Sequence, residues 1–257
     1  MGKICFISQP TFLPWLGWFD LADQSDVMVL LDDVAFSKQS WQQRNRIRTR
    51  NGLEFLTVPV KSSGRLGQMI LDCELADQPF SKKMITTFQA NYANAPFFAD
   101  FIEELAATIE AGVDTGSLVE LNCAVITWMA NKLEVTTPMI RASALGAGGE
   151  RGEHVAAICE CVGADRYLSP AGAEDYLIED KAAFDQRDIS VMLHVYEHPE
   201  YVQSFDPFMP YACALDLIFN VGPVAAEVMR SGRRPARMLG ENMQCNLEGF
   251  KRENCKS

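Results

Sequence analysis

The sequence predicts an α/β fold with a mostly parallel sheet. Residues 4–7 and 27–31 form two short apolar runs, each followed at once by polar side chains. Between them, apolar residues recur at three- and four-residue spacing, as in a helix with one buried face. Unbroken hydrophobicity is typical of parallel strands buried on both faces, and a strand–helix–strand unit is right-handed by default. Ligands bind at the carboxyl ends of such strands, so we expect the site where the polar residues follow the two runs.

Local signals predict the other elements in order. Pro14 suits the first turn of a helix over residues 14–24, and Asn51-Gly52 is a strong hairpin signal. Helical spacing predicts helices over 81–93, 96–111 and 117–133, and Ser117 begins a capping box in the last of these. Further strands are expected over 69–74, 137–142, 165–170 and 189–195, with helices over 153–162 and 214–221. The polar last twenty or so residues predict partial disorder.

Three segments follow from this order, and we expect them to form one compact domain. Residues 1–75 hold the βαβ unit and the hairpin, residues 76–135 are helical, and residues 136–257 are an α/β segment that returns to the same crevice. An apolar content of 48% is enough for a full core.

Composition narrows the class of function. A net charge of −11 argues against broad nucleic-acid binding. The sequence contains no run of about 18 apolar residues, so we expect no membrane insertion. The N-terminus has no secretory cleavage pattern, which favours a cytoplasmic protein. Most of the eight cysteines lie in apolar segments, as buried reduced thiols do. Cys159-Glu160-Cys161 lacks metal-site spacing, so we expect no structural metal.

Polar residues after the two leading strands are the first site candidates. Gln9 follows the first strand and either caps a loop or meets the crevice. Asp32 and Asp33 end the second strand, where they are turn formers or, alternatively, a carboxylate that orients an amine and one that acts as a base. Neighbouring strand residues point to opposite faces, so the two are not expected to serve one substrate. The sequence does not say which faces the site.

The block after Trp41 is a candidate anion site. Arg44 offers a planar two-pronged donor to phosphate or carboxylate, and Asn45 can fix orientation. Either a solvated face or a clamp at the mouth of the site would explain the basic residues at positions 38–50: Lys38, Arg44, Arg46, Arg48 and Arg50. The tryptophans are core residues or walls of a pocket for a sugar or base: Trp15, Trp18 and Trp41.

The C-terminal half adds a candidate base. His198 titrates near neutrality and shares a loop with Tyr201 and Gln203. Ser169 follows a strand without a Gly-x-Ser-x-Gly elbow, which favours hydrogen bonding to a ligand over a covalent role. One further pair lies one helical turn apart and either caps loops or faces the pocket: Asp216 and Asn220.

These blocks resemble the WbqC-like protein family. Its N-terminal signature is similar to Gln-Pro-x-Phe-Leu-Pro-Trp-x-Gly-Trp-Phe from Gln9 and to Trp-Gln-x-Arg-Asn-x-Ile from Trp41. His-Pro-x-Tyr-x-Gln from His198 and Leu-Asp-Leu-Ile-Phe-Asn-x-Gly from Leu215 resemble its C-terminal blocks. The resemblance covers about residues 3–230. Members are often encoded beside enzymes of surface polysaccharide and O-antigen synthesis, and some are labelled glycine or aminoacyl transferases from that context.

The N-terminal layout also resembles the HIGH-type nucleotidyltransferases, which implies a Rossmann-like N-terminal half. Those enzymes begin their first helix with a His-x-Gly-His motif. Here Pro14 or Trp15 and Trp18 stand at those positions, which argues against nucleotidyl transfer but not against the fold.

The resemblance and the residues together predict a transferase that adds a small acyl or aminoacyl group to a sugar amine. Its small-molecule partner would be a nucleotide-sugar or an acyl donor, bound by Arg44 and Asn45, with His198 and Asp32 or Asp33 handling the amine proton. Two alternatives remain open: a nucleotidyltransferase-like enzyme that activates a carboxylate, and a non-catalytic ligand-binding or scaffold protein. The sequence identifies no cofactor and no oligomeric state.

Overall fold

A six-stranded, mostly parallel sheet organises the protein, as the sequence predicts. The computed structural model describes residues 2–77 and 79–241. The strand order is β5-β2-β1-β6-β7-β8, and only β8 runs antiparallel to its neighbour. The strands are β1 (Ile4–Ser8), β2 (Val27–Leu30), β5 (Met139–Arg141), β6 (Arg166–Pro170), β7 (Ser190–Tyr196) and β8 (Arg233–Met238). The chain winds outward from β1 in one direction and from β6 in the other, so this is a Rossmann-like doubly wound sheet whose switch point lies between these strands.

The pairing of β1 and β6 opens a crevice at that switch point. Only Ile4↔Arg166 and Cys5↔Tyr167 are paired between them, although β1 continues to Ser8 and β6 to Pro170. On its other side, β1 stays paired with β2 as far as Ser8↔Leu30. The carboxyl ends of β1 and β6 therefore separate, and the gap becomes available to side chains and ligands.

Helices cover both faces of the sheet. They are α1 (Leu16–Asp23), α2 (Phe80–Tyr92), α3 (Phe98–Asp114), α4 (Leu118–Lys132), α5 (Gly152–Cys161), α6 (Glu174–Glu179), α7 (Lys181–Asp185), α8 (Leu215–Val221) and α9 (Ala225–Ser231). Alternate β1 residues enter different cores: Phe6 packs with α1–α4, α8 and α9, and Ile7 packs with α5–α7. This alternation is what a strand buried on both faces requires.

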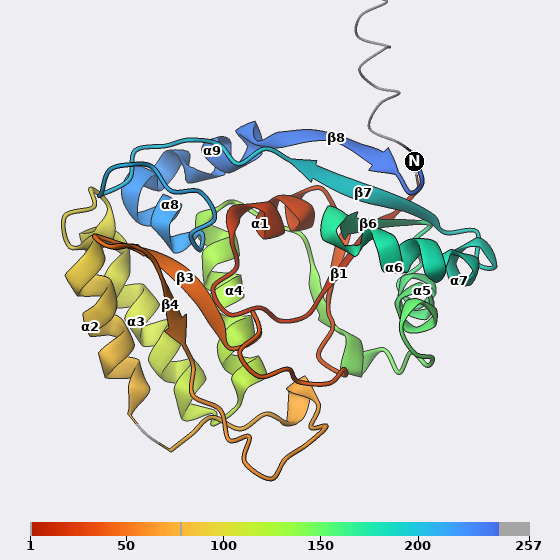
Figure 1. Ribbon diagram of the computed structural model, residues 1–257, viewed down its shortest axis with the longest axis horizontal. Helices are drawn as coiled ribbons and strands as arrows, with labels where there is room; N and C mark the ends of the chain where they lie inside the picture. Colours follow the sequence, from red (N-terminus) through yellow and green to blue (C-terminus); the bar gives the residue numbers. More distant parts are fainter. Residues whose placement is uncertain (1, 78, 242–257) are drawn as a thin grey trace, which may run out of the picture.

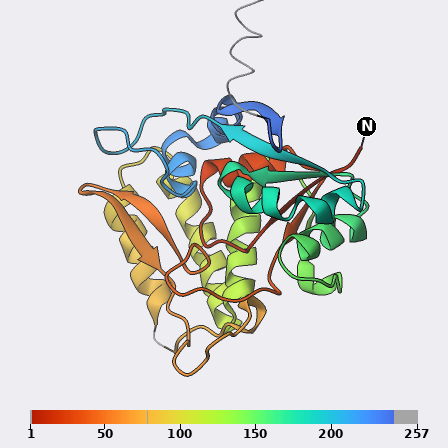
Figure 2. The same cartoon turned by 45° about the vertical axis from the view of Figure 1, so that its right-hand side comes forward.

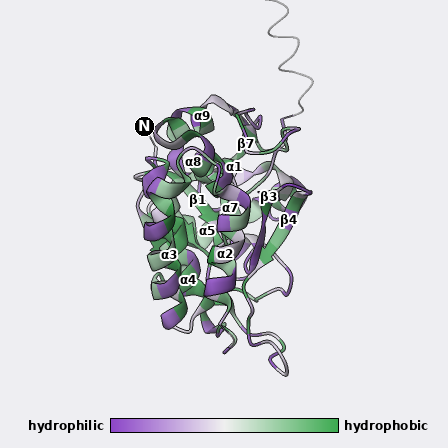
Figure 3. Cartoon of the chain, turned by 90° about the vertical axis from the view of Figure 1, so that its left-hand side faces the viewer, coloured by the Kyte–Doolittle hydropathy of each residue, from purple (hydrophilic) through white to green (hydrophobic). Residues whose placement is uncertain are grey.

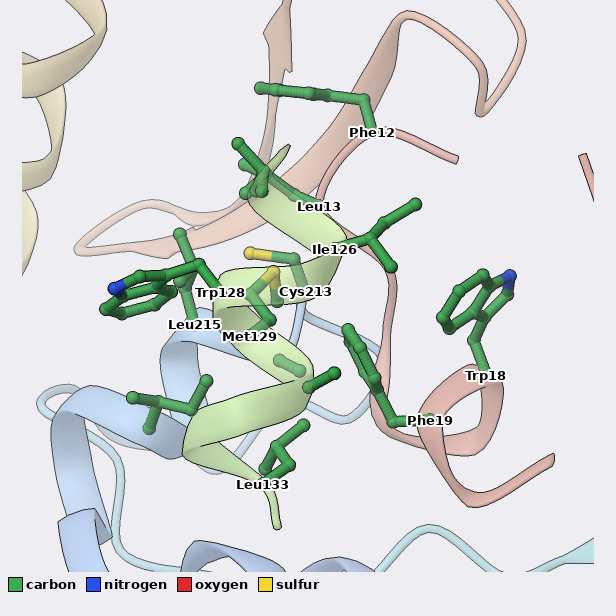
Figure 4. Close-up of a cluster of buried hydrophobic side chains, with 14 of the residues drawn as sticks. Phe12, Leu13, Trp18, Phe19, Ile126, Trp128, Met129, Leu133, Cys213 and Leu215 are labelled. Atoms are coloured by element: carbon green, nitrogen blue, oxygen red, sulfur yellow. The ribbon is translucent and has the colours of Figure 1, made fainter. Parts of the chain in front are cut away.

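The larger core is built around α4. Ile126 and Met129 of this helix, Phe19 of α1 and Leu215 of α8 are all buried in one cluster (Figure 4). Hydrophilic and hydrophobic residues alternate along α2 and α3 (Figure 3), which fits helices that bury one face and leave the other in solvent. The helices predicted over 81–93, 96–111 and 117–133 are confirmed with small shifts in their ends.

A separate hairpin lies beside the main sheet. It comprises β3 (Arg44–Thr49) and β4 (Gly52–Thr57), and its turn falls at the predicted Asn51-Gly52. Gly52 has φ 121°, a backbone conformation that favours glycine. The hairpin and helices α5 and α6 lie on opposite sides of β1 (Figures 1 and 2). The hairpin can therefore form one wall of the crevice.

The strand predicted over residues 69–74 was wrong. These residues contain a short 3-10 helix (Ile70–Asp72), and within the described chain Met69 and Glu74 each make a single bridge to another segment instead of a ladder. Strand β8 ends the main sheet, and its Arg233 lies 2.8 Å from the buried Asp20 carboxylate of α1. The disorder predicted for the last residues falls on 242–257, outside the described residues. Among residues that are described, no helix is long and apolar enough to cross a membrane.

Candidate functional site

A cavity of about 510 Å³ lies at the carboxyl ends of β1 and β6. This volume falls within the roughly 300–1,000 Å³ of typical small-molecule sites. The strands, the residue after β2, and helices α5 and α6 contribute Ile7, Ser8, Leu31, Val155, Tyr167, Pro170 and Tyr176 to its lining. The β1–α1 connection, α1, the hairpin segment and the loop before α8 contribute Gln9, Thr11, Trp15, Trp18, Trp41, Asn45, Arg46 and Tyr211. The cavity therefore combines aromatic rings, hydroxyls and amides with one guanidinium.

Two buried asparagines fix the loop that links β1 to α1. Asn45 donates through Nδ2 to the carbonyls of Phe12 (3.1 Å) and Leu13 (2.8 Å), and its Oδ1 accepts from the Arg46 amide (2.8 Å). Asn122 of α4 donates to the carbonyls of Pro10 (2.7 Å) and Gln42 (2.8 Å). Because a buried carbonyl without a donor is costly, these contacts hold residues 10–13 against the hairpin.

Gln9 and Gln42 extend the same connection to the rim of the cavity. Gln42 donates through Nε2 to Oε1 of Gln9 at 2.8 Å, and the Phe12 amide donates to the Trp41 carbonyl at 2.9 Å. Gln9 thus lines the cavity with its amide oxygen already held by the hairpin segment. A polar wall that is positioned before a ligand arrives loses less order on binding.

The tryptophan of the α1 N-terminus covers the place where phosphate binds in many related folds. A Cβ atom at Gly17 would lie 2.3 Å from the Trp15 ring, so only glycine lets the indole lie across the first turn of α1. Trp18 donates from Nε1 to Ser8 Oγ at 2.9 Å, which fixes the hydroxyl that ends β1. Both tryptophans line the cavity.

Arg46 enters the cavity and Arg44 does not. The guanidinium of Arg44 lies 4.3 Å from the ring centre of Phe55, and Arg44 does not line the cavity. The guanidinium of Arg46 lies 5.7 Å from the ring of Trp41, and Arg46 lines the cavity. The structure therefore places Asn45 in the cavity wall, as the hypothesis of an anion site requires. The arginine that lines the cavity with it is Arg46, two positions along the strand from the predicted Arg44.

His198 does not line the cavity, but its ring packs against two residues that do. Its ring is stacked on Trp15 (centroids 6.3 Å apart) and meets Tyr211 edge-on at 5.2 Å, and both of those residues line the cavity. Nδ1 lies 2.9 Å from the Pro199 carbonyl, which can only accept, so Nδ1 carries the proton and Nε2 the lone pair. Among the described residues, Nε2 is buried without a hydrogen-bond partner. Burial lowers the pKa of His198 below its usual value, which keeps the ring neutral at pH 7.

The carboxylates at the end of β2 are engaged by protein groups. Asp32 is fully buried and accepts from Arg141 Nε at 2.6 Å, from the Ser143 amide at 2.9 Å and from the Ser143 hydroxyl at 2.8 Å. Asp33 lies 3.2 Å from Nε2 of His154. Neither lines the cavity. These contacts tie β2 to the segment after β5 and to α5.

The remaining predicted residues do not line the cavity; those of the C-terminal half other than Ser169 form a hydrogen-bonded network beside it. Asp216 Oδ2 accepts from the Tyr201 hydroxyl at 2.7 Å and from Gln203 Nε2 at 2.8 Å, and burial raises the pKa of this carboxyl. Asn220 accepts from Ser204 at 2.8 Å. Ser169 is buried in β6 and donates to the adjacent Pro170 carbonyl at 3.3 Å. The network fixes the loop that carries His198 and Tyr211.

Five of the predicted site residues therefore meet at the cavity: Gln9, Trp15, Trp18, Trp41 and Asn45. Sequence reasoning missed Asn122, whose signal was a polar residue in a buried stretch of helix. It also missed Tyr211, which has φ 68°, a left-handed conformation rare for tyrosine, and no sequence pattern marks it. Within residues 2–77 and 79–241, no three His, Cys, Asp or Glu side chains gather closely enough to hold a metal ion.

A doubly wound sheet with a cavity of small-molecule size at its switch point places the chain in a broad class of α/β proteins. The family follows from the sequence: residues 9–228, more than half of the chain, match the model of the WbqC-like protein family, and the chain belongs to that family. It is 30% identical over 235 residues to the uncharacterized protein Rv1507c of Mycobacterium tuberculosis, covering 91% of this chain and 100% of that protein. No solved structure matches the chain.

Proposed function

We propose that the protein is a transferase of surface-polysaccharide synthesis that adds a small acyl or aminoacyl group to a sugar amine in the switch-point cavity. The observation that carries the proposal is the cavity itself: aromatic rings, amides and hydroxyls converge with an arginine where α/β folds bind substrates. The proposal that the transferred group is acyl or aminoacyl rests on the labels given to some members of the family that the sequence resembles.

The lining residues suit a sugar that carries a charged substituent. Flat indole faces pack against sugar rings, and Gln9 and Thr11 offer amide or hydroxyl partners for sugar hydroxyls. Arg46 supplies positive charge for phosphate or carboxylate oxygens. A nucleotide-sugar or a charged acyl donor has these features.

His198 is the proposed base for the amine proton, although it does not line the cavity. Its free Nε2 lone pair and its lowered pKa suit proton abstraction near neutral pH. Because Nε2 is buried and His198 does not line the cavity, the substrate amine would reach Nε2 only after neighbouring side chains move. Asp32 and Asp33 have no direct role in this proposal, because other side chains engage both carboxylates and neither lines the cavity.

A non-catalytic ligand-binding protein is the second candidate, and one observation favours it. Among the described residues that line the cavity there is no His, Asp, Glu, Lys or Cys, so hydroxyl groups are the only side chains there of the kinds that commonly act as acid, base or nucleophile. The nucleotidyltransferase alternative has less support, because the Trp15 indole covers the first turn of α1, where a triphosphate would bind.

The test begins with small molecules that co-purify with the protein, identified by mass spectrometry. Protein is then incubated with amino-sugar nucleotides and a panel of acyl and glycyl donors, and the sugar is examined for the mass of the added group. The proposal expects a product with wild-type protein and at least a tenfold lower rate with His198→Gln. Tight binding of a sugar nucleotide with no product from any donor, and equal binding by His198→Gln, would support the non-catalytic candidate instead.

A further inference from the structure

Arg46 is a charged side chain without a protein counter-ion. It is half-buried, its Nε is buried without a hydrogen-bond partner, and no salt bridge to it occurs within the described part of the chain. Its main contact is the Trp41 ring, 5.7 Å from the guanidinium. A buried donor without a partner is costly, so the arrangement suggests that a ligand completes it.

The other arginines of the same strand lie in different surroundings. Arg48 is buried and donates to the carbonyls of Thr49, Phe205 and Pro207 at 2.6–3.0 Å, although its Nε, like that of Arg46, has no hydrogen-bond partner among the described residues. Arg44 packs on Phe55 outside the cavity. Arg46 alone combines a position in the cavity wall with unused donors, so its role differs from that of its neighbours.

The charge of the cavity favours an anion. Of the lining residues in the described chain, Arg46 alone carries a formal charge, although the protein as a whole has a net charge of −11. A lone cation in a partly enclosed site raises the local concentration of anions. The usual alternative in this fold, the first turn of α1, is covered by the Trp15 indole.

We propose that Arg46 is the anion-binding residue of the cavity and that its ligand carries a phosphate or carboxylate group beside a ring that packs on the Trp15 or Trp41 indole. Both groups present paired oxygens to the guanidinium fork. The inference rests on the proposed function in taking the cavity as the substrate site, and it names the chemistry of that substrate. It does not depend on the group transferred.

Two matched pairs of probes separate the sources of the anion. UDP and uridine share a pyrimidine ring and differ in phosphate, whereas orotate and uracil share a ring and differ in carboxylate. Each is titrated into protein with nitrogen-labelled arginine side chains, and the Nε–H signal of Arg46, assigned from Arg46→Lys, is followed by NMR. Arg46→Gln is the test variant, and Arg44→Gln, two residues along the same strand, is the matched control.

The proposal expects UDP or orotate to shift the Arg46 signal and to bind more tightly than its neutral partner. Arg46→Gln should weaken binding of the charged probe about 10- to 100-fold and remove its advantage over the neutral one. Arg44→Gln should change affinity less than about twofold, and Arg46→Lys should retain part of it because it keeps the charge without the fork. Whichever pair responds identifies phosphate or carboxylate.

Three outcomes would overturn the proposal. The first is that the Arg46 signal fails to respond to either charged probe at millimolar concentration. The second is that Arg46→Gln binds the charged probe as tightly as wild type does. The third is that Arg46→Gln only lowers the melting temperature, which would make the residue a structural support for Trp41. Failure of acyl transfer with an intact Arg46 response would count against the proposed function alone. Transfer with an unaltered Arg46→Gln affinity would count against this inference alone.

Discussion

Replacing Asn45 by alanine tests how the cavity is held open. The side chain is 3% exposed and makes three hydrogen bonds, two of them to consecutive carbonyls of the β1–α1 loop. One of these carbonyls belongs to Leu13, whose φ of 47° is unfavourable for leucine and needs support from its surroundings. The substitution removes this support and leaves buried polar groups without partners.

The expected cost follows from the number of bonds lost. Three hydrogen bonds at a net 0.5–1.5 kcal/mol each give a loss of about 2–4 kcal/mol in the free energy of unfolding. For a chain of this size, that corresponds to a fall in melting temperature of about 5–15 °C. Urea unfolding, followed by circular dichroism, measures the free energy directly.

Asn51→Ala is the matched control on the same hairpin. Asn51 is exposed, and none of the described residues is a hydrogen-bond partner of its side chain, so its replacement should change stability by less than about 0.5 kcal/mol. If Asn45→Ala also costs under about 1 kcal/mol but abolishes ligand binding, Asn45 contacts the ligand and the loop-holding argument is refuted. A large stability loss accompanied by weaker binding is the result that the structure predicts.

Three further predictions concern the surroundings of the cavity. Asp32→Ala should destabilise the protein by about 2–4 kcal/mol in urea, because it strands Arg141 and the Ser143 amide, whereas a fall of less than 1 kcal/mol accompanied by lost activity would indicate a catalytic carboxylate. Gly17→Ala should displace the Trp15 indole, shift the tryptophan emission and cost about 1–3 kcal/mol, and an unchanged spectrum would contradict the packing. Because burial depresses the pKa of His198, the unfolded state binds more protons below the ordinary value of 6.5, so stability should fall as pH drops from 7.5 to 5.5. The fall should be smaller in His198→Phe, and equal pH profiles would argue against a depressed pKa.

The parallel sheet could be predicted from sequence because its signals are local. Residues 4–7 and 27–31 are apolar without a break, and strands buried on both faces require this pattern. The hairpin at Asn51-Gly52 and the cap at Ser117, whose hydroxyl accepts from the Glu120 amide, also rest on neighbouring residues. At these positions the local signal and the structure agree, whereas the strand predicted over residues 69–74 from an equally local pattern is a 3-10 helix.

The composition of the cavity wall could not be predicted in the same way, because it depends on distant contacts. Whether Arg44 or Arg46 faces the cavity is set by how the hairpin docks, and Asn122 and the β1–α1 loop, about 110 residues apart, decide that docking. Whether Asp32 is a turn former or a carboxylate of the site also depends on distant residues, because Arg141 and Ser143 engage it. His198 stacks on Trp15 and meets Tyr211, and both of these residues line the cavity, but His198 itself does not.

A crystallographic screen of small ring-bearing phosphates and carboxylates would test the site assignment most directly. Bound fragments should gather between β1 and β6, with a ring against Trp15 or Trp41 and acidic oxygens within hydrogen-bond distance of Arg46. Fragments that occupy other surfaces and leave this cavity empty would mean that the switch point is not where the protein binds its ligand.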